Sequence, residues 1–185
     1  MYLIVGLGNP EPQYSQTRHN VGFDTVNILA KKNGIDISKK EFDGLCGTGE
    51  IEGEKVIILK PQTFMNESGK SIVKAKNYYK VPEEKIIVIY DDIDIEEGIV
   101  KIRKKGGPGT HNGMRSIVSE LNSVNFPRVR IGTGQPIFKE LLISYVIQKL
   151  SDEQYEKLKP AIQKAENAVE EIIKEGIDNA MNKFN

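Results

Sequence analysis

Short apolar runs rich in β-branched residues alternate along the chain with longer segments whose apolar positions recur at helical spacing. The runs predict buried strands, because Gly, Pro or Asn stands close to most of them. They lie at residues 2–7, 56–59, 86–90 and 128–131. The stretch "EIEGEKVIILKP" adds a hairpin that turns near Gly53, and "GIVKIRKK" alternates apolar and basic positions as a half-exposed strand does.

Helical patterns fill the segments between these strands, at residues 21–32, 68–79 and 111–121 and in a long C-terminal stretch. Ser151 and Gln154 predict a capping box at the start of that last helix. Its apolar stripe, expected to dock on the rest of the chain, consists of Leu158, Ile162, Ala165, Val169 and Ile172 or Ile173. The alternation predicts an α/β fold: a single domain over residues 1–185, with a twisted mixed β-sheet flanked by helices and a C-terminal helix packed on the domain.

Length and composition indicate a protein with one hydrophobic core, no disulfide framework and no membrane span. The 185 residues, 38% of them hydrophobic, suit one sizeable core, and a single cysteine excludes an internal disulfide framework. No charged N-terminus precedes an apolar signal region, and no apolar run is long enough to span a membrane. We expect a cytoplasmic protein without membrane association. Because docking of the C-terminal helix should leave no exposed apolar stripe, we also expect a monomer.

The opening stretch "YLIVGLGNPEP" resembles the start of a dinucleotide-binding turn, with Gly6 and Gly8 after an apolar strand. Glu11 replaces the third glycine of that fingerprint and is flanked by prolines. A carboxylate repels phosphate, and proline lacks the N–H that would bind it. The loop "KKGGPGTHNG" at residues 104–113 likewise lacks the Gly-Lys-Ser/Thr ending of a nucleotide-cradling P-loop. The sequence therefore argues against both kinds of nucleotide site.

Charge is unevenly distributed along the chain. Its net charge is zero, yet the segment from Gly98 to Lys139 contains eight basic residues and one acid, Glu120. A face of this kind can hold a nucleic acid while the whole protein stays neutral, although a solvated face without a partner is the simpler alternative.

Both histidines are followed by asparagine: His19 in "TRHNVG" and His111 in "GTHNGM". Imidazole titrates near neutral pH, and an asparagine amide can position a water or an ester carbonyl without competing for the proton. Taken singly, each pair fits a helix cap or a surface polar pair equally well.

The stretch "IIVIYDDIDIEEG" carries Asp91, Asp92 and Asp94 past the end of a buried strand, where α/β proteins place their sites. Two interpretations are open: the acids hold Mg²⁺, or one acid orients and stabilises an imidazole. Asp91 and Asp92 should point to opposite faces of an extended strand, which argues against chelation of one ion.

The stretch "LKPQTFMNESGKS" places Asn66 in a loop at the end of the sheet, beside Phe64 and Met65. If exposed, the two apolar side chains would form a platform for a base or a peptide side chain; if buried, they belong to the core.

Taken together, six stretches resemble bacterial peptidyl-tRNA hydrolase. They are "IVGLGNP", "YSQTRHNVG", "KPQTFMNESG", "YDDIDIEEG", "GGPGTHNG" and "RVRIGTGQP", in the family's order and over most of the chain. The resemblance implies a monomeric α/β hydrolase of the translation machinery that needs no metal or cofactor. Its substrate would be peptidyl-tRNA released from ribosomes, cleaved at the ester bond between the peptide, or an N-blocked amino acid, and the 3′ end of tRNA.

The resemblance also implies roles for single residues. His19 matches the base that activates a water, and Asp91 matches the acid that orients its imidazole. The positions implied to contact substrate are Asn9, which would tell a blocked amine from a free one, and Tyr14, Phe64, Asn66 and Asn112. The positions that resemble the clamp on the tRNA 5′ phosphate are Arg103, Arg130 and Lys101, with Lys104 and Arg128 as neighbours of similar reach.

Two other classes of protein fit parts of the pattern. A non-enzymatic RNA-binding domain would use the basic segment and make both His-Asn pairs helix caps, so that His19→Ala would change no activity. A Mg²⁺-dependent phosphoesterase would use Asp91, Asp92 and Asp94 and would lose its activity in EDTA. The presence of both His19 and Asp91 favours the hydrolase.

Overall fold

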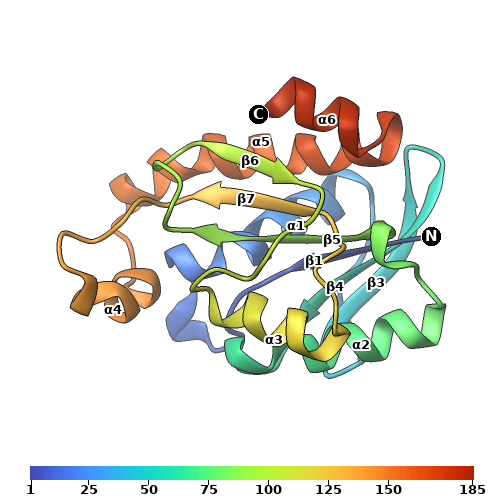
Figure 1. The fold of residues 1–185 in the computed structure, drawn as a ribbon, viewed down its shortest axis with the longest axis horizontal. Coiled ribbons are helices and arrows are strands. Elements are labelled where there is room, and N and C mark those ends of the chain that lie inside the picture. The colour runs from blue at the N-terminus through green and yellow to red at the C-terminus, as the bar shows by residue number, and fades with distance from the viewer.

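The computed structural model describes residues 1–185, and its seven strands form one mixed sheet in the order β2-β3-β4-β1-β5-β7-β6 (Figure 1). The strands are β1 (Tyr2–Gly6), β2 (Lys39–Glu41), β3 (Gly44–Ile51), β4 (Glu54–Pro61), β5 (Ile86–Asp92), β6 (Val100–Arg103) and β7 (Arg128–Gly132). The four central strands β4, β1, β5 and β7 are parallel, whereas β2, β3 and β6 pair antiparallel at the two edges. The predicted α/β fold with a mixed sheet is confirmed.

The chain forms six helices, five of which cover the two faces of the sheet. They are α1 (Val21–Lys32), α2 (Ser68–Tyr79), α3 (Asn112–Leu121), α4 (Leu142–Ile147), α5 (Asp152–Glu175) and α6 (Ile177–Phe184). Five single 3-10 turns complete the chain: η1 (Pro12–Tyr14), η2 (Arg18–Asn20), η3 (Met65–Glu67), η4 (Glu83–Lys85) and η5 (Lys139–Leu141). Helices α1, α5 and α6 lie on one face, and α2 and α3 lie on the other (Figure 1).

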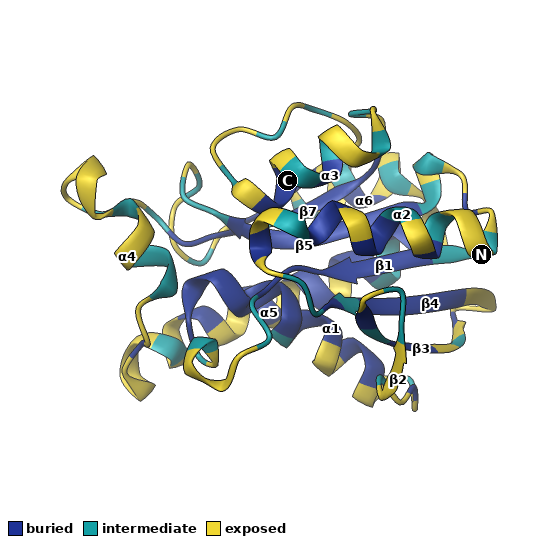
Figure 2. Ribbon diagram, turned by 90° about the horizontal axis from the view of Figure 1, so that it is seen from below, coloured by how far each residue is buried: buried dark blue, intermediate teal, exposed yellow.

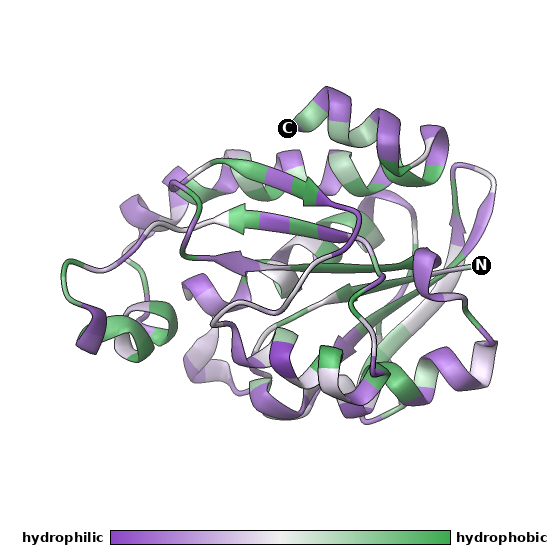
Figure 3. Cartoon of the chain, in the orientation of Figure 1, coloured by the Kyte–Doolittle hydropathy of each residue, from purple (hydrophilic) through white to green (hydrophobic).

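Each face of the sheet has its own core. Along β1, Ile4 packs into the core under α1 and α5, whereas Leu3 and Val5 pack into the core under α2 and α3. Side chains alternate between faces along a strand, so a strand covered on both sides reads as a continuous apolar run. Figure 2 shows these strands buried between helices whose outer surfaces are exposed. In Figure 3 the covering helices accordingly alternate hydrophilic and hydrophobic residues.

The C-terminal helix begins as predicted and is followed by a second helix. Gln154 N donates to Ser151 Oγ (3.1 Å) and Ser151 N donates to Gln154 Oε1 (2.9 Å), which completes the capping box. The predicted apolar stripe of α5 is buried throughout. Gly176, at φ +89°, ends α5, and the chain continues as α6, which packs against α5 and β6. Two helices therefore replace the single one predicted.

The segment between β7 and α5 was not predicted as an element. It forms η5 and α4, which project from one end of the molecule (Figures 1 and 2). Its large exposed apolar side chains are Ile137, Phe138, Leu141 and Ile143. The expectation that no exposed apolar surface would be left is therefore wrong, because α4 is too short and too far from the sheet to bury both of its sides.

No helix combines the length and the apolar character that a membrane span requires.

Helix α1 starts in direct contact with the ends of two strands. Leu7 N donates to Ile89 O (3.0 Å), and Phe23 N, in the first turn of α1, donates to Leu7 O (3.2 Å). One of the free N–H groups at the start of the helix is thereby paired. A Cβ at Gly22 would overlap the carbonyl oxygen of Ile89 and lie 2.6 Å from Leu7 N. Glycine at this position lets η2, just before α1, lie beside the end of β5.

Replacing Gly22 by alanine should destabilise the protein by about 1–3 kcal/mol in urea unfolding, because the methyl group would push α1 off the strands. The loss is expected even though alanine favours helix more than glycine does. Gly107→Ala is the matched control, since its added Cβ meets nothing within 4 Å. Equal stability of the two variants would contradict the close-packing argument.

Candidate active site

A cleft of about 580 Å³ opens where the parallel strands end. Its walls come from the turns that follow β1, β4 and β5, from the loop between β6 and α3, and from α4. The carboxyl ends of parallel strands are where α/β proteins bind ligands. The cleft brings together many of the residues singled out from the sequence: Asn9, His19, Met65, Asn66, Asp91, Asp92, Asp94, Arg103, His111, Asn112, Arg128 and Arg130.

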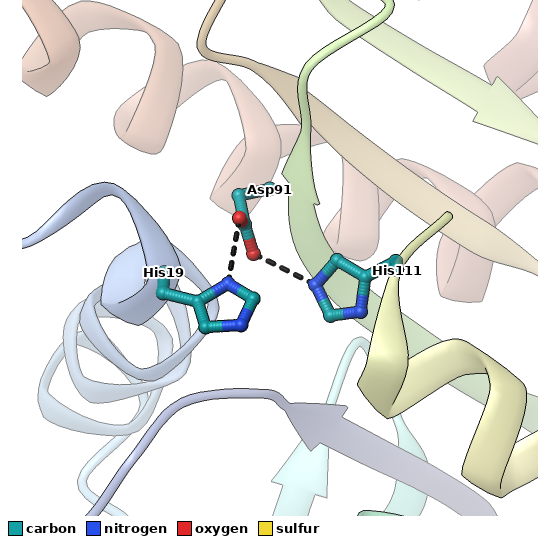
Figure 4. Close-up of side chains that lie close together, drawn as sticks. All are labelled: His19, Asp91 and His111. Carbon is teal, nitrogen blue, oxygen red and sulfur yellow. Dashed lines mark hydrogen bonds and ion pairs between the residues drawn. The ribbon is translucent and has the colours of Figure 1, made fainter. Parts of the chain in front are cut away.

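A buried carboxylate and an imidazole form the centre of this cleft (Figure 4). Asp91, at the end of β5, has a side chain only 1% exposed, and its Oδ2 lies 2.8 Å from His19 Nδ1. His19 is carried by η2, between β1 and α1, and its Nε2 has no hydrogen-bond partner within the protein. Of the two alternatives left open for these acids, a single aspartate held against an imidazole is the arrangement that the structure contains.

A second imidazole shares the same carboxylate. His111 Nε2 lies 2.9 Å from Asp91 Oδ1, so each carboxylate oxygen faces one histidine (Figure 4). His111 is also the N-cap of α3, since its Nδ1 accepts from Met114 N at 3.3 Å. The interpretation of a His-Asn pair as a helix cap therefore holds for His111, in addition to its contact with Asp91.

The surroundings of His19 and Asp91 shift both pKa values. Burial lowers the pKa of His19, but the charge of Asp91 and its hydrogen bond raise it, and the net shift is upward. For Asp91, burial raises the pKa, whereas the charges and hydrogen bonds of His19 and His111 lower it, and the net shift is strongly downward. Asp91 is therefore ionised at neutral pH and orients His19 with a proton on Nδ1.

The aspartates of the segment do not gather as Mg²⁺ ligands. Asp92 turns to Arg130, with Oδ2 3.4 Å from Nη1, and Asp94 accepts from Gln135 on the exposed surface. The only three groups of metal-ligand type whose ligand atoms lie close together are His19, Asp91 and His111. There, both carboxylate oxygens already serve as hydrogen-bond partners of the two rings, which accounts for the cluster.

Asn9 is held in place by two neighbours. Its backbone N–H donates to Asn20 Oδ1 (2.8 Å) and its carbonyl accepts from Asn20 Nδ2 (3.0 Å). Its own Oδ1 accepts from Met65 N at 3.2 Å, which leaves the amide NH₂ as the free group. Asn20, the asparagine of the first His-Asn pair, is buried, and its side chain binds the backbone of Asn9 without capping α1.

Two residues predicted to contact substrate lie outside the cleft lining. Tyr14 ends η1, and Phe64 precedes η3 with 66% of its surface exposed. Met65 next to it is buried at 6% exposure and joins the core under α2 and α3. Of the two alternatives for this apolar pair, the platform fits Phe64 and the core fits Met65.

The basic residues divide into two groups. Arg103 and Arg130 line the cleft, and Arg130 Nε has no partner. Lys101 pairs with Arg130 across β6 and β7 but lies outside the cleft lining. Arg128 is 1% exposed, and its guanidinium donates to the carbonyls of Phe126, Val124 and Gly107 at 3.0–3.2 Å. Arg128 borders the cleft as well, but these three bonds hold its guanidinium inside the protein, which argues against its use in binding phosphate.

Helix α4 contributes an apolar wall that sequence reasoning missed. Leu142, Val146 and Ile147 line the cleft. Tyr145 anchors this helix: its hydroxyl donates to Thr133 O (2.7 Å), and its ring lies 3.7 Å from the guanidinium carbon of Arg18. Arg18 precedes His19 in η2, so the stacked pair of Arg18 and Tyr145 connects this apolar wall to the segment that carries His19. A short apolar stretch after a strand gave no signal that it would fold back over the site.

The fold and this cleft define an α/β enzyme built around an imidazole held by a buried carboxylate. The family model described as peptidyl-tRNA hydrolase matches residues 3–185. The peptidyl-tRNA hydrolase of Clostridium acetobutylicum is 51% identical over 185 residues, covering 100% of this chain and 98% of its own. That of Thermoanaerobacter sp. (strain X514) is 52% identical over 185 residues and 100% of both chains.

A solved structure of this family has the same fold. The crystal structure of peptidyl-tRNA hydrolase from Acinetobacter baumannii is 40% identical, with a TM-score of 0.94, covering 100% of this chain and 94% of that chain. The chain belongs to the peptidyl-tRNA hydrolase family, as the six ordered stretches indicated.

Removing the carboxylate should reverse the pKa shift of His19. In Asp91→Asn, the charge that raises the pKa is lost while burial, which lowers it, remains. The pKa of His19 should therefore fall below its ordinary value of 6.5, as measured by NMR titration of the ring protons. Asp92→Asn serves as the control, because that carboxylate faces Arg130. An unchanged pKa in Asp91→Asn would show that the pair does not govern the titration of His19.

Proposed function

We propose that this enzyme hydrolyses the ester bond between the peptide and the 3′ end of tRNA with a water activated by His19, without a metal ion. The observation that carries the proposal is the pairing of His19 Nδ1 with Asp91, which leaves Nε2 as a free base in the cleft. Cys46, the one thiol, is buried in the core and is not available as a nucleophile for this reaction.

In the first step, the oxygen of a water attacks the ester carbonyl carbon and one of its protons passes to His19 Nε2. Asp91 stabilises the imidazolium that forms, and general base catalysis of this kind contributes roughly 10²- to 10⁴-fold. Asn66 and Asn112 line the cleft with polar amides, and we assign them to the carbonyl oxygen, where charge develops, and to the water. His19 then returns that proton to the ribose oxygen as the ester bond breaks. The products are tRNA and the carboxylic acid of the peptide, which releases the second proton of the water to solvent.

Selection of a blocked amine is assigned to Asn9. Its Oδ1 is engaged by Met65 N, so the group left for the substrate is an N–H donor. A donor binds the carbonyl oxygen of a peptide bond, which a free aminoacyl group lacks at its amine, and it repels an ammonium ion. Tyr14 and Phe64, outside the cleft lining, are assigned to contacts with more distant parts of the substrate.

Arg103, Arg130 and Lys101 are assigned to phosphate binding. Both arginines line the cleft; Arg103 is exposed at the end of β6, and the buried Nε of Arg130 has no hydrogen-bond partner. Contacts of this kind carry no sequence information, so they suit an enzyme that serves all tRNAs. That the protein acts as a single-domain monomer in the cytoplasm remains a prediction from the sequence.

The catalytic proposal is tested by hydrolysis of N-acetyl-aminoacyl-tRNA and of free aminoacyl-tRNA in the presence of EDTA. We expect the wild type to cleave only the blocked substrate, and His19→Ala to lose about 10²- to 10⁴-fold in rate while still binding tRNA. Loss of the wild-type rate in EDTA would support the Mg²⁺-dependent alternative. If tRNA binds without being cleaved, the RNA-binding alternative is correct.

The phosphate clamp is tested separately by tRNA affinity at several salt concentrations. Arg103→Ala and Arg130→Ala should each weaken binding and reduce the salt dependence by about one ion for each phosphate that is no longer neutralised. Lys164→Ala, an exposed charge change on α5, is the control and should leave both unchanged. A salt dependence that stays at the wild-type value in both arginine variants would exclude these residues from phosphate binding.

A further inference from the structure

The carboxylate of Asp91, which contacts the proposed base His19, also contacts a second imidazole ring, that of His111. Asp91 Oδ2 faces His19 Nδ1 at 2.8 Å and Oδ1 faces His111 Nε2 at 2.9 Å, and the ring centroids of the two histidines are 4.9 Å apart. The carboxylate is buried and accepts no other hydrogen bond from the protein. Whatever stabilisation this negative charge receives therefore comes from these two imidazoles together.

Helix α3 fixes the protonation of His111. Met114 N, in the first turn, donates to His111 Nδ1, so this nitrogen carries no proton. The proton of the neutral ring must then be on Nε2, which points at Asp91. The two ring nitrogens of His111 therefore have different partners: Nδ1 accepts from the backbone of α3, and Nε2 donates to Asp91.

The remaining charged groups near the pair are engaged elsewhere. On β5, Asp92 faces Arg130. On η2, Arg18 stacks on Tyr145 of α4 and donates to its carbonyl. The ring of Tyr90 meets His111 edge-on at 5.0 Å, and burial raises the pKa of its hydroxyl, so it is neutral. Asp91 is the one anion in contact with His19, and His111 is the one other group that competes for it.

We propose that His111 is a positioning residue that takes up one oxygen of the Asp91 carboxylate and so limits how strongly Asp91 favours the protonated form of His19. The inference rests on the proposed role of His19 as a base. A carboxylate that served His19 alone would hold the imidazolium more tightly, and a protonated ring cannot accept a proton from water. The second histidine would in this way match the base to the pH at which it works.

Two amide substitutions separate the two contacts of His111. In His111→Asn, the side-chain oxygen can still accept from Met114 N as an N-cap, but nothing donates to Asp91. In His111→Gln, the longer side chain can place an N–H donor near the former Nε2 position. His111→Ser, which also caps the helix without reaching Asp91, gives the same test if the Asn variant does not fold.

The experiment measures the pKa of His19 by NMR and the pH dependence of kcat/KM for N-acetyl-aminoacyl-tRNA. His111→Asn should raise the pKa of His19, and the acidic limb of the pH profile, by about half a unit to one unit, since a net hydrogen bond corresponds to roughly that shift. Its kcat/KM should approach the wild-type value well above that midpoint. His111→Gln should stay near the wild-type midpoint.

A lower kcat/KM at every pH with an unchanged midpoint in His111→Asn would overturn the inference, because it would limit His111 to packing or substrate contact. The NMR titration needs no turnover, so it tests the shared carboxylate even if the wild type hydrolyses nothing. In that case the proposed hydrolysis fails while the effect of His111 on the pKa of His19 is still measured.

Discussion

The arrangement of side chains in the cleft depends on one buried negative charge, the carboxylate of Asp91. A carboxylate removed from water is very costly unless charged or hydrogen-bonding groups surround it. Asp91 sits at the end of β5, in the middle of the sheet, and its two partners arrive from opposite sides, His19 before α1 and His111 before α3. The same contacts that make the charge tolerable there hold both rings in position, so stability of this region and readiness for chemistry have one physical origin.

The elements around this charge show what a sequence can specify. The central strands and α1 and α2 were predictable, because long apolar runs and helical periodicity leave few alternatives for segments buried on a sheet. The bounds of α1 and α2 agree with the prediction, and α3 begins one residue late because His111 is its cap. Strand β2 and helix α4 were missed, since elements of three and six residues carry too little periodicity to be recognised.

The site was predictable in its parts and less so in its connections. His19, Asp91 and the three asparagines could be singled out because their side-chain chemistry is rare or suggestive in this chain, and the resemblance fixed their order. The sequence could not reveal which groups are in contact. Two examples are the Asp91 carboxylate, which contacts both His19 and His111, and the side chain of Asn20, which binds the backbone of Asn9. Contacts between segments distant along the chain are set by the packing of the whole fold, and no local pattern reports them.

Arg128 is a charged residue whose contacts are structural. Its planar side chain reaches the carbonyls of Phe126, Val124 and Gly107, which belong to two different connections of the chain, and it stacks on Phe126 as well. It therefore acts as a brace between the turn before β7 and the glycine-rich loop that leads to His111. Lysine, with a single ammonium group, could not reach the same three acceptors. Arg128→Lys would therefore keep the charge but lose the contacts that join these two loops.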